Sequence, residues 1–204
     1  MRRYVIICMS IICVILLLTS CKNSKNVEGN NKQVSSVHIM SFIQNVEEHS
    51  DFTDQPKGFQ VIANIKKTFD DNTQNVYIVC ELTIDKPKKQ MKNVYITSVF
   101  NTEINKYLLV DYPYISNRAG EAVTIFPNKY PKGMVVGRAF IAKKTVDDTD
   151  DLKDLFTNMK TKITWEDQSG KRHSEYIMLD KDEISLDKSV ITYFQKSIKN
   201  NLKP

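Results

Sequence analysis

The sequence predicts a mostly β protein with the architecture of an antiparallel β-sandwich. Three observations favour this fold class. Between residues 59 and 179, about seven or eight short runs are rich in β-branched and aromatic residues. Apolar and polar residues alternate along several of these runs, which is the period of a strand buried on one side. Asn, Pro and Gly separate the runs at the close spacing of turns between antiparallel strands.

The first two runs predict a β-hairpin. Apolar residues occupy every second position in residues 59–65 and again in residues 76–84, and a polar loop separates the two segments. Cys80 is in phase with the apolar residues of its run, so we expect its side chain to face the core. A buried free cysteine behaves there as a small hydrophobic residue.

Later segments predict the other strands of the sandwich domain. They are short, rich in β-branched or aromatic residues and flanked by turn residues, and they comprise residues 93–100, 107–112, 122–126, 134–144 and 162–179. The last segment holds two strands around the turn Asp167–Gly170. Gly137 is a candidate for a bulge or a close approach within its strand. Residues 149–159 predict one short inserted helix, because Thr149 or Asp150 provides an N-cap and acidic residues fill the first turn.

The segments that flank residues 59–179 differ in character. Residues 36–58 form an N-terminal extension. The stretch of residues 35–48 suits both the helical and the strand period, and we interpret it as a strand. Residues 180–204 predict a C-terminal amphipathic helix, because apolar residues recur there every four positions. This helix either packs on the sandwich or binds a membrane surface or a partner.

The first 20 residues have the pattern of a secretory signal peptide. Arg2 and Arg3 open the segment, an apolar run from Tyr4 to Leu18 follows, and small polar residues end it. The apolar run is shorter than the roughly 20 residues that a membrane-spanning helix needs. The paired arginines also suit a twin-arginine export signal, although so hydrophobic a run fits ordinary secretion better.

Residues 18–21, at the end of this segment, resemble the processing site of a known class of proteins. Leu18-Thr19-Ser20-Cys21 is similar to the lipobox of bacterial lipoproteins. The resemblance implies cleavage between Ser20 and Cys21 and attachment of a diacylglyceryl group to Cys21, which anchors the chain in membrane lipid on the extracytoplasmic face of the cell membrane. Residues 21–35 are polar and predict a flexible, lipidated tether. The alternative is an uncleaved signal anchor in which the cysteine stands by chance.

The spacing of strands in residues 59–179 is also loosely similar to that of immunoglobulin-like domains on Gram-positive surface lipoproteins.

Composition limits the partners of such a domain. The chain has a formal net charge of +5, which falls to +3 once residues 1–20 and their two arginines are removed. This charge is too small to indicate nucleic acid as a partner. Processing leaves Cys80 as the one free thiol, so we expect no disulfide within the chain.

No catalytic pattern is present in the sequence. It has no glycine-rich phosphate loop and no nucleophile elbow. The three histidines, His38, His49 and His173, match no local zinc spacing. The acidic residues 147–154 fail the spacing of an EF-hand, although a looser calcium site stays open. We therefore expect no catalytic residues, no metal and no cofactor.

Two surface features are candidates for recognition. The aromatic loops offer large contact areas with polar tips, and their residues are Tyr112, Tyr114, Phe126 and Tyr130. Residues 86–92, KPKKQMK, form the densest basic patch, which either is a solvated loop or contacts anionic lipid or wall polymer.

The sequence as a whole indicates a non-enzymatic lipoprotein that acts as an interaction module of the cell envelope, with another envelope protein as its partner. The alternative is a lipoprotein that binds a small ligand or a metal. An enzyme would require distant residues, such as His173, Glu166 and an acid of residues 147–154, to meet in one pocket.

Overall fold

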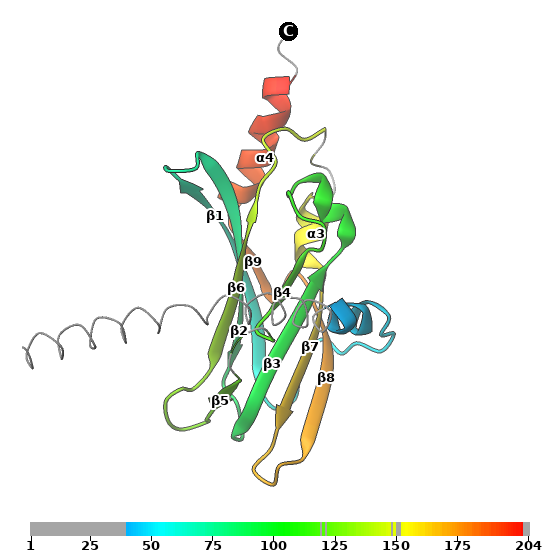
Figure 1. The fold of residues 1–204 in the computed structure, drawn as a ribbon, viewed down its shortest axis with the longest axis vertical. Coiled ribbons are helices and arrows are strands. Elements are labelled where there is room, and N and C mark those ends of the chain that lie inside the picture. Colours follow the sequence, from blue (N-terminus) through cyan, green and yellow to red (C-terminus); the bar gives the residue numbers. More distant parts are fainter. Residues whose placement is uncertain (1–39, 119, 121, 148, 150–151, 202–204) are drawn as a thin grey trace, which may run out of the picture. The chain divides into compact units, whose positions relative to one another are not determined.

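The computed structural model in Figure 1 describes residues 40–118, 120, 122–147, 149 and 152–201. The contacts divide the chain into two units, Met1–Met40 and Ser41–Pro204, and the elements described below belong to the second. The expected signal peptide, the lipidation site Cys21 and the tether of residues 21–35 lie outside the described residues. None of the helices in the described ranges combines the length and the apolar character needed to cross a membrane.

The second unit is mostly β, as predicted, and its strands form two sheets. The four-stranded sheet has the order β6-β2-β1-β9; the five-stranded sheet has the order β4-β3-β7-β8, with β5 also paired to β3. The strands are β1 (Gln60–Asp70), β2 (Asn75–Asp85), β3 (Met91–Phe100), β4 (Tyr114–Ser116), β5 (Val123–Ile125), β6 (Met134–Ile141), β7 (Met159–Glu166), β8 (Arg172–Leu179) and β9 (Ile184–Leu186). All pairs are antiparallel except β1 with β9. This arrangement is consistent with a β-sandwich (Figure 1).

The core lies between the two sheets and follows the alternation of the sequence. Every second residue is buried from Val61 to Ile65 on β1 and from Ile78 to Ile84 on β2. The two strands pair over their whole length, as the predicted hairpin requires. Cys80 is fully buried, and burial raises the pKa of its thiol. The prediction that Cys80 faces the core is confirmed, and we expect its thiol to react slowly in the folded chain.

The helical elements η1 (Thr102–Lys106), α3 (Leu152–Thr157) and α4 (Lys188–Asn201) lie toward the upper end of the domain in Figure 1. Helix α4 starts where Asp187 Oδ1 accepts a hydrogen bond from the Ser189 amide at 2.6 Å, which is an N-cap contact. Val190 and Phe194 of α4 are fully buried, and the Phe194 ring lies 5.4 Å from that of Tyr107. Of the two alternatives for this helix, its described residues show packing on the sandwich.

The prediction of a strand within residues 35–48 is wrong for the part that the structure describes. Residues 41–47 form a helix, drawn in blue in Figure 1. Ile43 and Val46 lie three positions apart on it and are both buried. The apolar residues of this stretch suit either period, and burial of one helical face against the folded domain decides between them.

Two other boundaries also differ from those predicted. Residues 107–112 form no strand but only an isolated bridge between Leu108 and Ala142, and the strand β4 comes after them. Residues 180–187, predicted as the start of the C-terminal helix, contain a turn and the strand β9, which adds to the edge of β1. In both places the backbone conformation depends on a short pairing with a neighbouring strand. No local sequence pattern reveals such a pairing.

Candidate functional site

A cavity of about 450 Å³ lies on the outer face of the five-stranded sheet. Val94 and Ile96 of β3 both face the core, so Tyr95 between them faces outward. Tyr95 pairs with Thr164 on β7, and Thr164 pairs with Ser174 on β8. These three residues form a row across the sheet and the floor of the cavity.

Two walls rise above this floor. One is the helix of residues 41–47, which contributes Phe42, and the other is the loop after β4, which contributes Arg118. The helix is fastened to the outer face of the sheet by Asn45, whose Oδ1 accepts hydrogen bonds from Lys162 Nζ at 2.5 Å and from the Tyr176 hydroxyl at 2.7 Å. The chain that enters the domain therefore forms part of the cavity itself.

A β-bulge re-aims one side chain into the cavity. Lys92 pairs with Glu166 and Tyr95 pairs with Thr164, so β3 carries one extra residue between these two pairs. Asn93 in the bulge has a φ of 50°, in the left-handed region that asparagine tolerates better than most residues. Its Nδ2 donates a hydrogen bond to Glu166 Oε2 at 2.8 Å. Bulges of this kind occur often beside functional sites.

Asn117 fixes the loop that carries Arg118. Its Oδ1 accepts a hydrogen bond from the Ile96 amide at 2.8 Å, and its Nδ2 donates one to the Val94 carbonyl at 3.0 Å. The side chain thus occupies the edge of β3 between the segments paired with β4 and β5. The Ser116 hydroxyl also accepts a bond from the Arg118 amide at 3.2 Å. The loop is held at both residues before Arg118, which positions the guanidinium group.

The guanidinium group of Arg118 lies between two aromatic rings. Its central carbon is 3.3 Å from the centroid of the Phe42 ring and 5.0 Å from that of the Tyr95 ring, and its Nη2 donates a hydrogen bond to Thr164 Oγ1 at 3.1 Å. Burial lowers the pKa of Arg118, and the nearby Tyr95 opposes part of this shift. No carboxylate of the described residues lies within 4.0 Å of the group. Arginine stays charged in proteins, so this cation is partly desolvated and has no ionic partner among the described residues.

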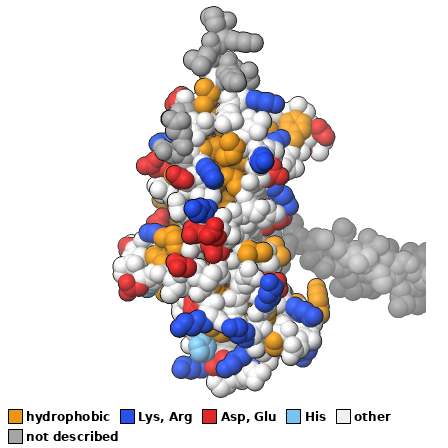
Figure 2. Space-filling view, turned by 180° about the vertical axis from the view of Figure 1, so that it is seen from behind, with side chains coloured by type: hydrophobic (Ala, Val, Ile, Leu, Met, Phe, Trp, Pro, Cys, Tyr) orange, Lys and Arg blue, Asp and Glu red, His pale blue; other side chains and the backbone are white. Residues whose placement is uncertain are grey.

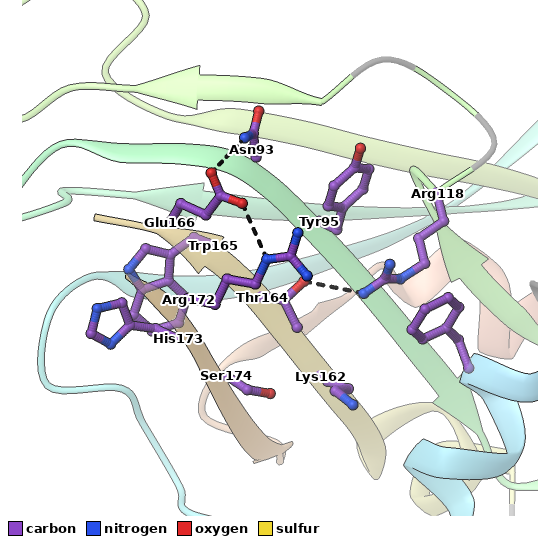
Figure 3. A pocket seen from close by; sticks show the side chains of 11 residues that line it. Asn93, Tyr95, Arg118, Lys162, Thr164, Trp165, Glu166, Arg172, His173 and Ser174 are labelled. Atoms are coloured by element: carbon purple, nitrogen blue, oxygen red, sulfur yellow. Dashed lines mark hydrogen bonds and ion pairs between the residues drawn. The ribbon is translucent and has the colours of Figure 1, made fainter. Parts of the chain in front are cut away.

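The other charged groups of the cavity are partly compensated. Glu166 Oε1 lies 3.3 Å from Nε of Arg172, and Figure 3 shows this carboxylate between Arg172 and Asn93. Lys162 carries the third positive charge of the lining. Three cations and one carboxylate give the lining a formal charge of +2 with histidine neutral. The cavity is therefore positively charged.

His173 and Trp165 lie at the end of the cavity near the β7–β8 turn. The two rings are stacked with centroids 5.2 Å apart, and His173 Nε2 is 2.9 Å from Asp167 Oδ2. Hydrogen bonds from the Ser169 hydroxyl and from His173 hold the pKa of Asp167 far below its usual range. Asp167 also accepts the Ser169 and Lys171 amides, so its carboxylate stabilises the turn.

Among the described residues, the cavity brings together two of the three groups that the enzyme alternative requires. Glu166 and His173 both line the cavity, whereas no described residue of the stretch 147–154 does. Within the described ranges, no three His, Cys, Asp or Glu residues are placed to hold a metal ion.

The four aromatic residues predicted for recognition lie outside this cavity and do not form one surface. Tyr114 pairs with Val99 near one end of β3, whereas β5, which precedes Phe126, pairs with Met91 at the other end. The ring of Tyr114 packs against Arg138, and that of Phe126 packs against Lys129. Tyr112 and Tyr130 are 49% and 91% exposed.

The basic residues 86–92 reach the same end of the domain as the cavity. Lys92 Nζ lies 3.5 Å from the Gln168 carbonyl oxygen, in the β7–β8 turn. On the face shown in Figure 2, Lys and Arg side chains gather around a histidine at the lower end, and acidic side chains gather nearer the middle. The basic patch and the cavity therefore belong to one positively charged region.

Sequence reasoning missed Phe42 and Arg118 as members of a site. A lone arginine in the loop YISNRAG resembles many surface arginines, and nothing in the sequence pairs it with a phenylalanine 76 positions earlier. Compared with models of known protein families, the chain matches none, and a comparison with curated proteins finds no relative either.

Proposed function

We propose that the chain is a lipid-anchored lipoprotein of the cell envelope that acts by binding, and that the cavity on the outer face of β3, β7 and β8 is its binding site. The lipobox-like residues 18–21 support the anchor and the extracytoplasmic location. The two mostly antiparallel sheets suit an immunoglobulin-like scaffold, a kind of fold that commonly presents recognition sites.

The observation that carries this proposal is the partial desolvation of the Arg118 guanidinium group at the wall of the cavity. Desolvating a cation is costly, and the surrounding residues recover only part of that cost through two aromatic rings and one neutral hydroxyl. Asn117 and Ser116 nevertheless hold the loop so that the guanidinium group stays over the cavity. A preformed cavity with a few fixed polar groups is the usual form of a ligand site, and 450 Å³ lies within the usual range of volumes.

Binding suits the groups of the cavity better than catalysis. Glu166 is engaged by Asn93 and Arg172, and His173 is engaged by Asp167 in the turn. Among the described residues, no hydrogen bond joins either group to a hydroxyl or thiol for which it would act as a base. These contacts favour a site that recognises a ligand and leaves it chemically unchanged.

A protein partner is the second candidate function. It is favoured by Tyr130, which is 91% exposed in the loop between β5 and β6, because solvent-exposed tyrosines often anchor protein interfaces. This loop lies apart from the cavity, so both kinds of binding are compatible in one chain.

Blocking the cavity tests its role in binding. Ser174 is an exposed residue on β8, and phenylalanine suits an outward strand position, so Ser174→Phe fills the cavity and keeps the fold. Thr68→Phe is the matched control, because Thr68 is an exposed strand residue on the other sheet. We expect that, in a small-molecule screen of the full-length chain in detergent, a ligand raises the Tm of the wild type and of Thr68→Phe but not of Ser174→Phe. A ligand that stabilises all three proteins equally would refute the cavity as the site.

A further inference from the structure

We infer that the cavity takes a compact organic oxyanion, a carboxylate or a phosphate, and that Arg118 holds its charged group. This inference rests on the proposed function, that the cavity is a binding site. It is carried by the geometry of the guanidinium group, by the charge of the lining and by the chemistry of the other walls.

The geometry leaves one direction of approach to Arg118. Phe42 covers one face of the planar group, and Tyr95 lies over the group as well, at the longer distance of 5.0 Å. Of the five N–H donors of an arginine, one is used by Thr164, and the rest donate to no described residue. A ligand therefore meets these donors in the plane of the group. Carboxylates and phosphates accept two parallel hydrogen bonds in that plane.

The charge of the lining favours an anion. Arg172 and Glu166 form an ion pair, so the uncompensated positive charge of the lining lies with Arg118 and Lys162. Figure 3 shows Arg118 and Arg172 reaching toward the floor of the cavity from opposite sides. The basic end of the domain in Figure 2 adds a positive potential that attracts anions to this region.

The remaining walls indicate that the ligand has a body as well as a charge. The volume of 450 Å³ exceeds what a lone oxyanion fills, since a water molecule occupies about 30 Å³ of liquid. Asn93 and Ser174 present an amide and a hydroxyl, and Tyr95 presents a ring, which together suit a hydroxylated carbon skeleton. Sugar acids and sugar phosphates have this combination of groups.

The chain contains its own reporter for a test. Trp165 is the one tryptophan of the sequence and lines the cavity. Its fluorescence is followed in the full-length chain in neutral detergent at constant ionic strength. The probes are acetate, inorganic phosphate, gluconate and glucose 6-phosphate, and glucose is the uncharged counterpart. We expect a saturable change with each oxyanion, tighter binding of gluconate or glucose 6-phosphate than of the small ions, and no saturation with glucose.

Substitution of Arg118 assigns the response to the guanidinium group. We expect Arg118→Gln to weaken oxyanion binding at least tenfold, the order of effect of losing a charge-assisted pair of hydrogen bonds, and Arg118→Lys to recover only part of it. Arg138→Gln is the matched control. Arg138 also lies over two rings, those of Tyr114 and Phe140, and donates one hydrogen bond, but it does not line the cavity. Its substitution leaves oxyanion affinity unchanged.

The outcomes separate this inference from the function on which it rests. Equal binding of glucose and glucose 6-phosphate would overturn the oxyanion inference while the cavity remains a binding site. Wild-type protein that responds to none of the oxyanions would overturn it as well, whether or not the Arg118 variants fold. The Ser174→Phe comparison tests a separate claim, that the cavity is the binding site, and its screen includes neutral compounds as well as oxyanions.

Discussion

Replacing Asn117 by alanine removes the side chain that ties the Arg118 loop to β3. The side chain accepts a hydrogen bond from the Ile96 amide and donates one to the Val94 carbonyl, in a partly buried position. Because alanine leaves both backbone groups without this partner, each lost bond costs about 1–2 kcal/mol, and we expect the free energy of unfolding to fall by about 2–4 kcal/mol. In a domain of this size the Tm then falls by about 4–16 °C.

Thermal denaturation of the full-length chain in detergent, followed by far-ultraviolet circular dichroism, measures this loss. Asn158→Ala is the control, since its amide donates one exposed hydrogen bond to the Asp154 carbonyl at 3.0 Å. We expect the control to lose less than about 1 kcal/mol. If Asn117→Ala and Asn158→Ala were equally stable, the side chain of Asn117 would not replace a strand at the edge of β3, and the account of how Arg118 is positioned would fail.

Three further predictions concern the helix, the turn and the core. Val46→Ala removes buried methyl groups from the helix of residues 41–47, so we expect a loss of about 2 kcal/mol in urea denaturation, whereas the exposed Glu47→Ala changes stability by less than about 0.5 kcal/mol. Native contacts hold the pKa of Asp167 below its value in the unfolded chain, so they stabilise the fold above about pH 4, and this contribution is lost as the pH falls through the native pKa. The Tm of Asp167→Asn therefore falls less steeply than that of the wild type between about pH 4 and pH 2; parallel curves would contradict this. Burial raises the pKa of the Cys80 thiol, so we expect a maleimide to label Cys80 in about 6 M guanidinium chloride, which unfolds the chain, but not in the folded chain. Rapid labelling of Cys80 in the folded chain would place the thiol at the surface.

The hairpin of β1 and β2 could be predicted because its information is local. Each strand has 11 residues, the alternation holds along the first half of β1 and most of β2, and a polar loop joins the strands. Cys80 follows from the same periodicity. A strand of this length that is buried on one face leaves no second interpretation open.

The helix of residues 41–47 and the strand β4 could not be predicted in this way. Apolar residues in the helix suit two periods, and contact with the outer face of the five-stranded sheet selects one of them. Strand β4 has only three residues and follows Pro113, so its sequence resembles a turn until its pairing with β3 is known. Short elements depend on their neighbours more than on their own residues.

The cavity could not be predicted because its members come from distant parts of the chain. Phe42, Tyr95, Arg118 and Thr164 belong to a helix, two strands and a loop. The sequence directs attention to exposed tyrosines and dense lysines, which local composition reveals. No local pattern in the sequence indicates that the fold places a single arginine, Arg118, between two aromatic rings.

Native mass spectrometry of the wild-type chain, extracted from its own membrane in mild detergent, tests the central claim most directly. The account predicts a chain that begins at Cys21, carries a diacylglyceryl group, and holds a non-covalent small anion that Arg118→Gln loses and Arg138→Gln keeps. A chain that retains residues 1–20 without lipid, or one whose bound anion is the same in all three proteins, would contradict the account.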